Sequence, residues 1–166
     1  MNQNKKENLA YIIPVIILII ILFFIFFFRL RIYKIVGSSM NPTLYENEFV
    51  LSYKTTYKRQ DIIAFNHNQA IMIKRIIGLP KDKIDIKDDG TVYVNNMKIS
   101  EPYINAKSLG KVEISFPYIV PENSYFVMGD NREHSLDSRS IPIGAINEED
   151  IIGKVSLSLI PFKSLN

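Results

Sequence analysis

The sequence contains no cysteine and only two histidines, His67 and His134. The lack of cysteine excludes disulfide frameworks, thiolate zinc sites and cysteine nucleophiles. Two histidines are too few for a histidine-rich metal site, so we expect neither a metal ion nor another cofactor. The net charge is only +3 over 166 residues, which argues against a dedicated nucleic-acid-binding protein.

The small positive charge is concentrated at the N-terminus. The first 34 residues hold five basic residues and one acidic residue, whereas the rest of the chain is slightly acidic. Hydrophobic residues make up 47% of the sequence, which is too apolar for a disordered chain, and the length suits about one folded domain. The five basic residues are Lys5, Lys6, Arg29, Arg31 and Lys34.

Residues 9–28 form a long run without a charged side chain. These 20 residues, LAYIIPVIILIIILFFIFFF, would extend about 30 Å as a helix, which matches the hydrocarbon core of a bilayer. A buried helix of a soluble protein would show a polar face, and a cleaved signal peptide would be shorter and would end in small residues. The sequence therefore predicts a single transmembrane helix at 9–28, preceded by a short tail at 1–8.

The charges on either side of this run give a conflicting orientation. Lys5 and Lys6 precede it, whereas Arg29, Arg31 and Lys34 follow it. Counted alone, these charges would place the domain after the helix inside the cell.

From residue 35 to residue 166, the pattern indicates one compact, antiparallel, mostly β domain with few helices. Asp89-Gly90 and Asn95-Asn96 mark tight turns between short strand-like runs. A short helix is expected at 147–151, whereas residues 100–121 show no clear period and are expected to form loop or edge strand. The strand-like runs are 49–53, 61–65, 70–79, 83–86, 91–94, 97–99, 124–130 and 154–162.

Two segments contain a candidate nucleophile and a candidate base. The segment GSSMNPTL, residues 37–44, places Ser39 close to a glycine turn. Lys74 lies between Met72 and Ile76 on one face of an apolar strand. Burial there would lower the pKa of the amine and let it act as a general base, whereas a lysine at the rim of the sheet would reach water and stay charged.

A third segment, MGDNREHSLDSRS at residues 128–140, is dense in charged and hydroxyl side chains and follows an apolar strand. Asp137 and Arg139 are two positions apart, so both can point the same way and form an ion pair. Alone, such a loop is equally consistent with solvated surface.

Together, in this order, the three segments resemble the boxes of the type I signal peptidases (leader peptidases), in the short form associated with Gram-positive bacteria. The box S-M-x-P-T-L is matched by Ser39–Leu44, and K-R-x-x-G-x-P-x-D is matched by Lys74–Asp82. The box G-D-N-x-x-x-S-x-D-S-R is matched by Gly129–Arg139. Lys81 departs from the glycine often found in the family, which implies only a loop difference.

The resemblance implies a membrane-anchored serine endopeptidase with a Ser–Lys dyad in a β-rich protease domain of signal-peptidase type. Ser39 would attack the scissile carbonyl, and neutral Lys74 would take its proton and later activate water. Ser135 would hydrogen-bond the Lys74 amine, and the Ser39 N–H would bind the oxyanion. The supporting ion pairs would be Asp137 with Arg139 and Asp130 with Arg75.

The same resemblance implies the substrates and the location. The partners would be the lipid bilayer and exported preproteins that carry signal peptides with small side chains one and three residues before the cut. Met40, Leu44 and Ile73 match positions that line the corresponding pockets. The catalytic domain would lie outside the bacterial cytoplasmic membrane and the N-terminus inside, against the charge count. Gly37 stands where some members have a hydroxyl residue that serves as a second oxyanion donor. The identity of the second donor therefore stays open, with Ser38 as a candidate.

Two other functions fit parts of the sequence. One is a protease with a Ser–His–Asp triad, whose members would be Ser39, His134 and an aspartate. A related surface-protein or pilus assembly factor, with dedicated or no cleavage activity, would also carry such boxes, but a factor without activity would be expected to lose the serine or the lysine of the dyad.

Overall fold

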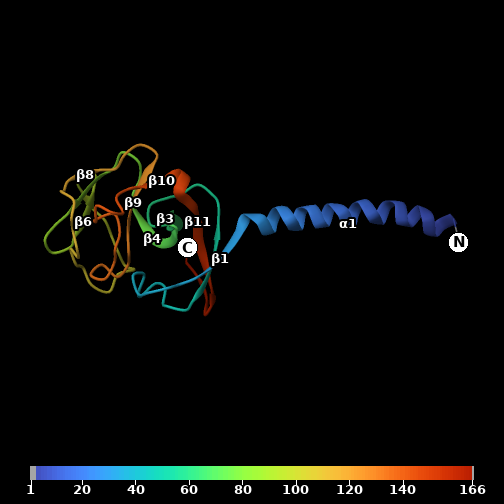
Figure 1. The fold of residues 1–166 in the computed structure, drawn as a ribbon, viewed down its shortest axis with the longest axis horizontal. Coiled ribbons are helices and arrows are strands. Elements are labelled where there is room, and N and C mark those ends of the chain that lie inside the picture. The colour runs from blue at the N-terminus through green and yellow to red at the C-terminus, as the bar shows by residue number, and fades with distance from the viewer. Residues whose placement is uncertain (1–2, 166) are drawn as a thin grey trace. The chain divides into compact units, whose positions relative to one another are not determined.

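The computed structural model describes residues 3–165, and the chain divides into two compact units, Met1–Arg31 and Ile32–Asn166 (Figure 1). The first unit is mostly helical, and the second contains strands β2 to β12 and most of β1.

Helix α1 (Gln3–Arg29) makes up most of the first unit. It contains the whole run 9–28, so the helix expected there is present, with Pro14 inside it. Among the residues that the structure describes, no helix is long and apolar enough to cross a bilayer, which differs from the transmembrane helix expected from the sequence. A membrane crossing by this run stays a prediction from the sequence.

The second unit is built on an eight-stranded sheet of order β1-β2-β11-β3-β4-β9-β10, in which β12 also pairs with β11. The long strand β11 pairs antiparallel with β2 and β3, so the end of the chain is joined to its first strands. The strands are β1 (Leu30–Lys34), β2 (Phe49–Tyr53), β3 (Ile62–His67), β4 (Ala70–Gly78), β9 (Ser124–Met128), β10 (Ile146–Asn147), β11 (Ile151–Ile160) and β12 (Phe162–Ser164).

The β3–β4 hairpin determines where the candidate base lies. His67 is paired with Ala70, and the two residues between them, Asn68 and Gln69, both have positive φ, as the type I′ hairpin turn requires. Since a slip of one residue would move every side chain to the other face, this turn fixes the face on which Lys74 lies.

A second, four-stranded antiparallel sheet has the order β7-β6-β5-β8. The turns expected at Asp89-Gly90 and Asn95-Asn96 are present, and Gly90, Asn95 and Asn96 all have positive φ. The hairpins expected in this part of the chain are therefore confirmed. The strands are β5 (Lys83–Ile86), β6 (Val92–Val94), β7 (Met97–Lys98) and β8 (Tyr118–Ile119).

Buried side chains cover both faces of the large sheet. Along β3, Ile63 and Phe65 belong to one hydrophobic cluster, and Ile62 and Ala64 belong to another. A third cluster joins the small sheet to Phe126 and Met128 on β9. The apolar faces of both sheets are thus buried within one continuous, mostly β domain, as the sequence predicted.

The segment 100–121 contains only the two-residue strand β8, so it forms the loop or edge strand that was expected. The short helix expected at 147–151 is a 3₁₀ turn at Glu148–Asp150. The irregular segment also contacts the loop that follows β9, since Arg139 donates to the carbonyl oxygen of Leu109 at 2.8 Å.

Candidate active site

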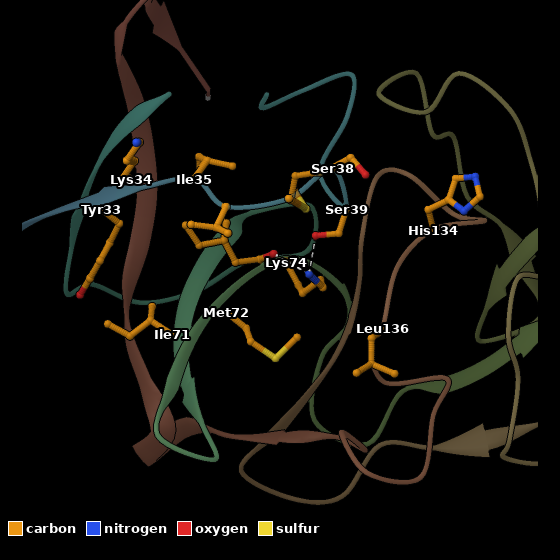
Figure 2. A pocket seen from close by; sticks show the side chains of 14 residues that line it. Tyr33, Lys34, Ile35, Ser38, Ser39, Ile71, Met72, Lys74, His134 and Leu136 are labelled. Atoms are coloured by element: carbon orange, nitrogen blue, oxygen red, sulfur yellow. Dashed lines mark hydrogen bonds between the residues drawn. The ribbon is translucent and has the colours of Figure 1, made fainter. Parts of the chain in front are cut away.

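Lys74 is buried within β4 although it carries an ionisable amine. Its exposed fraction is 4%, and its Nζ donates to Ser39 Oγ at 2.7 Å and to the carbonyl oxygen of Ile73 at 3.1 Å. Figure 2 shows the amine directed toward the Ser39 hydroxyl. The fold therefore brings together the candidate nucleophile and the candidate base, which are 35 positions apart in the sequence.

Burial lowers the pKa of Lys74 from 10.5 to about 8, because desolvation disfavours the charged amine. The carboxylates of Asp137 and Asp130 act in the opposite direction and limit this shift. A lysine with such a pKa is partly neutral at mildly alkaline pH and can accept a proton. The alternative of a rim lysine that reaches water is therefore wrong for this position.

The Ser39 segment is anchored from two sides. Met40 and Leu44 are buried in the hydrophobic core. The N–H of Asn131 donates to the carbonyl oxygen of Ser39 at 3.0 Å, which joins this segment to the loop after β9. Within the described part of the chain, the Ser39 N–H has no hydrogen-bond partner, so it is available to a ligand.

Both ion pairs predicted from the sequence are present. Arg75 binds Asp130 through Nε and NH2, at 2.8 and 2.6 Å. Arg139 binds Asp137 in the same way, at 2.8 Å for each contact. All four side chains are at most 7% exposed, and two-point contacts of this kind fix the geometry of both partners. The Thr43 hydroxyl donates to Asp130 Oδ2 at 2.5 Å, so the nucleophile segment is attached to the first pair.

The hydrogen bond expected between Ser135 and Lys74 is absent. Ser135 Oγ is buried and has no partner among the described residues. It lies against Gly129, where an added Cβ would meet this hydroxyl and, at 2.5 Å, the carbonyl oxygen of Ser39. The expectation was wrong because the hydroxyl packs over the glycine, while the amine bonds to Ser39 and Ile73.

A pocket of about 380 Å³ opens beside the Ser39–Lys74 contact. Met40 and Ile73 line it as expected, whereas Leu44 does not, because its side chain is fully buried in the core. Sequence reasoning missed several further lining residues from β1, β4 and the loop after β9. Figure 2 shows Tyr33 and Ile71 on one side of the Ser39–Lys74 contact and His134 and Leu136 on the other.

The histidines do not form a triad with the serine. His134 is an exposed residue of the pocket lining, and the hydrogen-bond partner of Ser39 Oγ is Lys74. His67 lies at the end of β3, where its Nε2 contacts the side-chain amide of Asn68. The geometry therefore favours the lysine as the proton acceptor.

Sequence reasoning also missed a buried arginine and its partners. Arg132 is 1% exposed, donates from Nε to the carbonyl oxygen of Gly129 at 3.0 Å and forms an ion pair with Glu101 at 2.5 Å. Glu101 lies in the aperiodic segment 100–121, and Arg132 lies among charged residues that suggest a solvated loop. Nothing in either pattern pointed to burial.

Comparison with known proteins agrees with this geometry. The family model described as "Signal peptidase, peptidase S26" matches residues 8–160. Signal peptidase I of Bacillus licheniformis is 37% identical, over 98% of this chain and 94% of that protein. Signal peptidase IB of Staphylococcus aureus is also 37% identical, over 95% of this chain and 92% of that protein.

A solved structure is similar as well. The crystal structure of a signal peptidase I from Enterococcus faecalis matches with a TM-score of 0.51 and 33% identity, over 62% of this chain and 99% of that chain. Its likeness supports a mostly antiparallel β protease domain of the same type. From these matches, which extend over nearly the whole sequence, the chain belongs to the signal peptidase family, peptidase S26.

Proposed function

We propose that this protein is a serine endopeptidase that removes signal peptides from exported preproteins, with Ser39 as the nucleophile and Lys74 as the general base. The observation that carries the proposal is the 2.7 Å contact between Ser39 Oγ and a buried Lys74 amine whose pKa is lowered to about 8. Membership of the signal peptidase family supports the reaction class and the kind of substrate.

The proposed reaction has two halves, and the lysine moves a proton in each. Neutral Lys74 takes the hydroxyl proton of Ser39 as Oγ bonds to the scissile carbonyl carbon, and returns it to the amine that leaves when the peptide C–N bond breaks. In the second half, Lys74 takes a proton from water, whose oxygen attacks the acyl-enzyme ester, and returns it to Ser39 Oγ as the ester bond breaks.

Backbone and ion-pair groups have supporting roles in this proposal. The free N–H of Ser39 is the first oxyanion donor, and Ser38 stays a candidate for the second. Asp130 with Arg75 holds the loop after β9 against β4, and Asp137 with Arg139 fixes the shape of the loop itself. Neither pair transfers a proton.

The proposed substrate has small side chains one and three residues before the cut. Met40 and Ile73, which line the pocket beside the nucleophile, would contact these side chains. In this proposal the pocket of about 380 Å³ is shared among several substrate residues, so each of them would carry only a small group.

Incubating the detergent-solubilised protein with a labelled preprotein should release the signal peptide at a single site, after a small residue. Replacing the residue before the cut by phenylalanine should prevent release, because the proposed substrate carries a small side chain at this position. The products are separated by electrophoresis and the new N-terminus is sequenced.

Two variants control this assay. Ser39→Ala should release nothing, which excludes a contaminating protease. His134→Ala should retain most of the activity, because its ring accepts no proton from Ser39 in the proposed reaction. Equal inactivity of His134→Ala and Ser39→Ala would contradict the lysine mechanism, and full activity of Ser39→Ala would contradict the serine protease itself.

We also propose that residues 9–28 anchor the protein in the bacterial cytoplasmic membrane, with the N-terminus inside and the catalytic domain outside. The support is the length of the uncharged run and the resemblance to the family. The positive-inside rule is a statistical bias, so a single exception is tolerable.

Protease added to intact spheroplasts should digest the domain that follows Lys34 and leave the N-terminal tail protected. The double substitution Arg29→Ser and Arg31→Ser should keep this orientation, and lysed spheroplasts are the control in which the tail is digested too. A domain protected in intact spheroplasts would contradict the orientation, and a protein washed from membranes at alkaline pH would contradict the anchor.

A further inference from the structure

Tyr103 lies between two arginine side chains beside the candidate active site. The guanidinium of Arg75 is 4.0 Å from the centre of the Tyr103 ring, and that of Arg132 is 6.0 Å from it. Both distances are within the range in which a cation is attracted to the face of an aromatic ring. The ring comes from the irregular segment 100–121, to which the sequence assigned no function.

The two arginines hold consecutive residues of the loop after β9. Arg75 binds the side chain of Asp130 at two points. Arg132 donates to the carbonyl oxygen of Gly129. Tyr103 thus contacts both cations that fix the backbone at the point where this loop leaves β9.

Arg75 further connects this loop to the nucleophile segment and to β4. Its NH1 donates to the carbonyl oxygen of Gln60 at 2.7 Å, and its NH2 reaches Thr43 Oγ1 at 3.3 Å. Lys74 is its neighbour in the strand. A shift of the Arg75 side chain would therefore disturb the residues on either side of the Ser39–Lys74 contact.

The position of the ring is itself fixed by Glu101. The Tyr103 hydroxyl donates to Glu101 Oε1 at 3.2 Å, and the same carboxylate forms the ion pair with Arg132. Two buried guanidinium groups close together repel each other unless counter-charges and an electron-rich surface separate them. Glu101, Asp130 and the ring face provide this separation.

We propose that Tyr103 is a positioning residue for the Ser39–Lys74 pair, since its ring packs against the Arg75 guanidinium that binds Asp130. This inference rests on the proposed function. Within the described part of the chain, the ring and its hydroxyl contact Arg75, Arg132 and Glu101 rather than Ser39 or Lys74, so Tyr103 acts through the arginines. It makes the segment 100–121, although irregular, part of the structure that orients the candidate dyad.

The test compares kcat and KM for preprotein cleavage in three variants of the full-length protein in detergent. Tyr103→Leu removes the ring face and should lower kcat roughly 10- to 100-fold, because small displacements of reacting groups are costly. KM should change by less than about threefold, since the pocket lining is untouched. Tyr103→Phe keeps the ring face and should stay within about threefold of the wild-type kcat.

Tyr118→Leu is the matched control. Tyr118 packs against the same third hydrophobic cluster as Tyr103, and its ring centre is 5.5 Å from that of Phe126, but among the described residues the two arginines lie at the Tyr103 ring and not at that of Tyr118. In thermal unfolding, Tyr118→Leu should lose about as much stability as Tyr103→Leu. Its kcat should stay within about twofold of the wild type. If Tyr103→Leu does not fold, Tyr103→Met, whose longer and more flexible side chain adapts to the space of the ring, is measured by the same criterion.

The outcomes separate this inference from the proposed function. A folded Tyr103→Leu or Tyr103→Met protein with wild-type kcat would overturn the positioning role, as would a Tyr103→Phe protein as slow as Tyr103→Leu or a Tyr118→Leu protein with the same kcat defect. The proposed function fails only if the wild type does not cleave the preprotein or if Ser39→Ala cleaves it equally well.

Discussion

Replacing Lys74 by methionine is expected to abolish cleavage, with a loss of at least about 10³-fold in kcat/KM. Methionine has a similar length and fills the same space in β4, but it accepts no proton from Ser39. The residual rate should equal that of Ser39→Ala, because a nucleophile and its base act as one unit. The wild-type kcat/KM should rise with pH through an apparent pKa near 8, the value to which burial lowers the amine.

The same pKa determines how stability depends on pH. The ordinary pKa of the amine is 10.5, and the pKa in the folded protein is about 8. Between these values the unfolded chain binds a proton that the native protein does not, so the free energy of unfolding rises with pH across this window. This gain in stability is lost again as the pH falls toward 8. The difference between the two pKa values corresponds to roughly 3 kcal/mol of unfolding free energy.

Lys74→Met lacks this dependence and should be at least as stable as the wild type at pH 7, where the native lysine carries a buried charge. The difference in Tm between the two proteins should narrow as the pH rises from 8 to 10. Thermal unfolding in detergent measures it, and titrations elsewhere in the chain cancel in the difference. A methionine variant clearly less stable at pH 7, or wild-type activity that stays flat down to pH 6, would leave Lys74 an ordinary charged residue.

Local patterns in the sequence were sufficient for most of the β domain. Turn residues that tolerate positive φ, such as Asn95, Asn96 and Gly90, marked the hairpins of the small sheet correctly. The order of strands in the large sheet could not be obtained in this way. It depends on β11, which pairs with two strands about 100 positions earlier in the chain, and no local period encodes such a pairing.

The sequence predicted only part of the candidate site, again because the contacts join parts of the chain that are far apart. The meeting of Ser39 with Lys74 came from the resemblance to a family, since their spacing alone indicates no contact. Ser135 was expected to face the amine, but its side-chain direction depends on packing against Gly129. Tyr103 was missed altogether, because its neighbours Arg75 and Arg132 come from other parts of the chain.

Adding one methyl group at Gly129 is expected to lower kcat roughly 100-fold, although this glycine takes no part in the chemistry. A Cβ here would lie 2.5 Å from the carbonyl oxygen of Ser39 and would also meet the Ser135 side chain. The first neighbour is backbone and cannot rotate away, so the nucleophile segment must move. Overpacking of this kind should also lower stability by about 1–3 kcal/mol.

Gly78→Ala separates the loss of activity from the loss of stability. Its Cβ would lie 2.7 Å from Ile84 Cδ1 and 3.0 Å from Val120 Cγ2, so it would displace side-chain atoms of the third hydrophobic cluster and not the backbone of Ser39. Thermal unfolding should show a decrease in Tm for both variants, larger for Gly129→Ala, whereas kcat of Gly78→Ala should stay within about twofold of the wild type. Because the two glycines differ mainly in which neighbour is displaced, equal kcat values in the two folded variants would mean that the position of the Ser39 backbone does not limit the reaction.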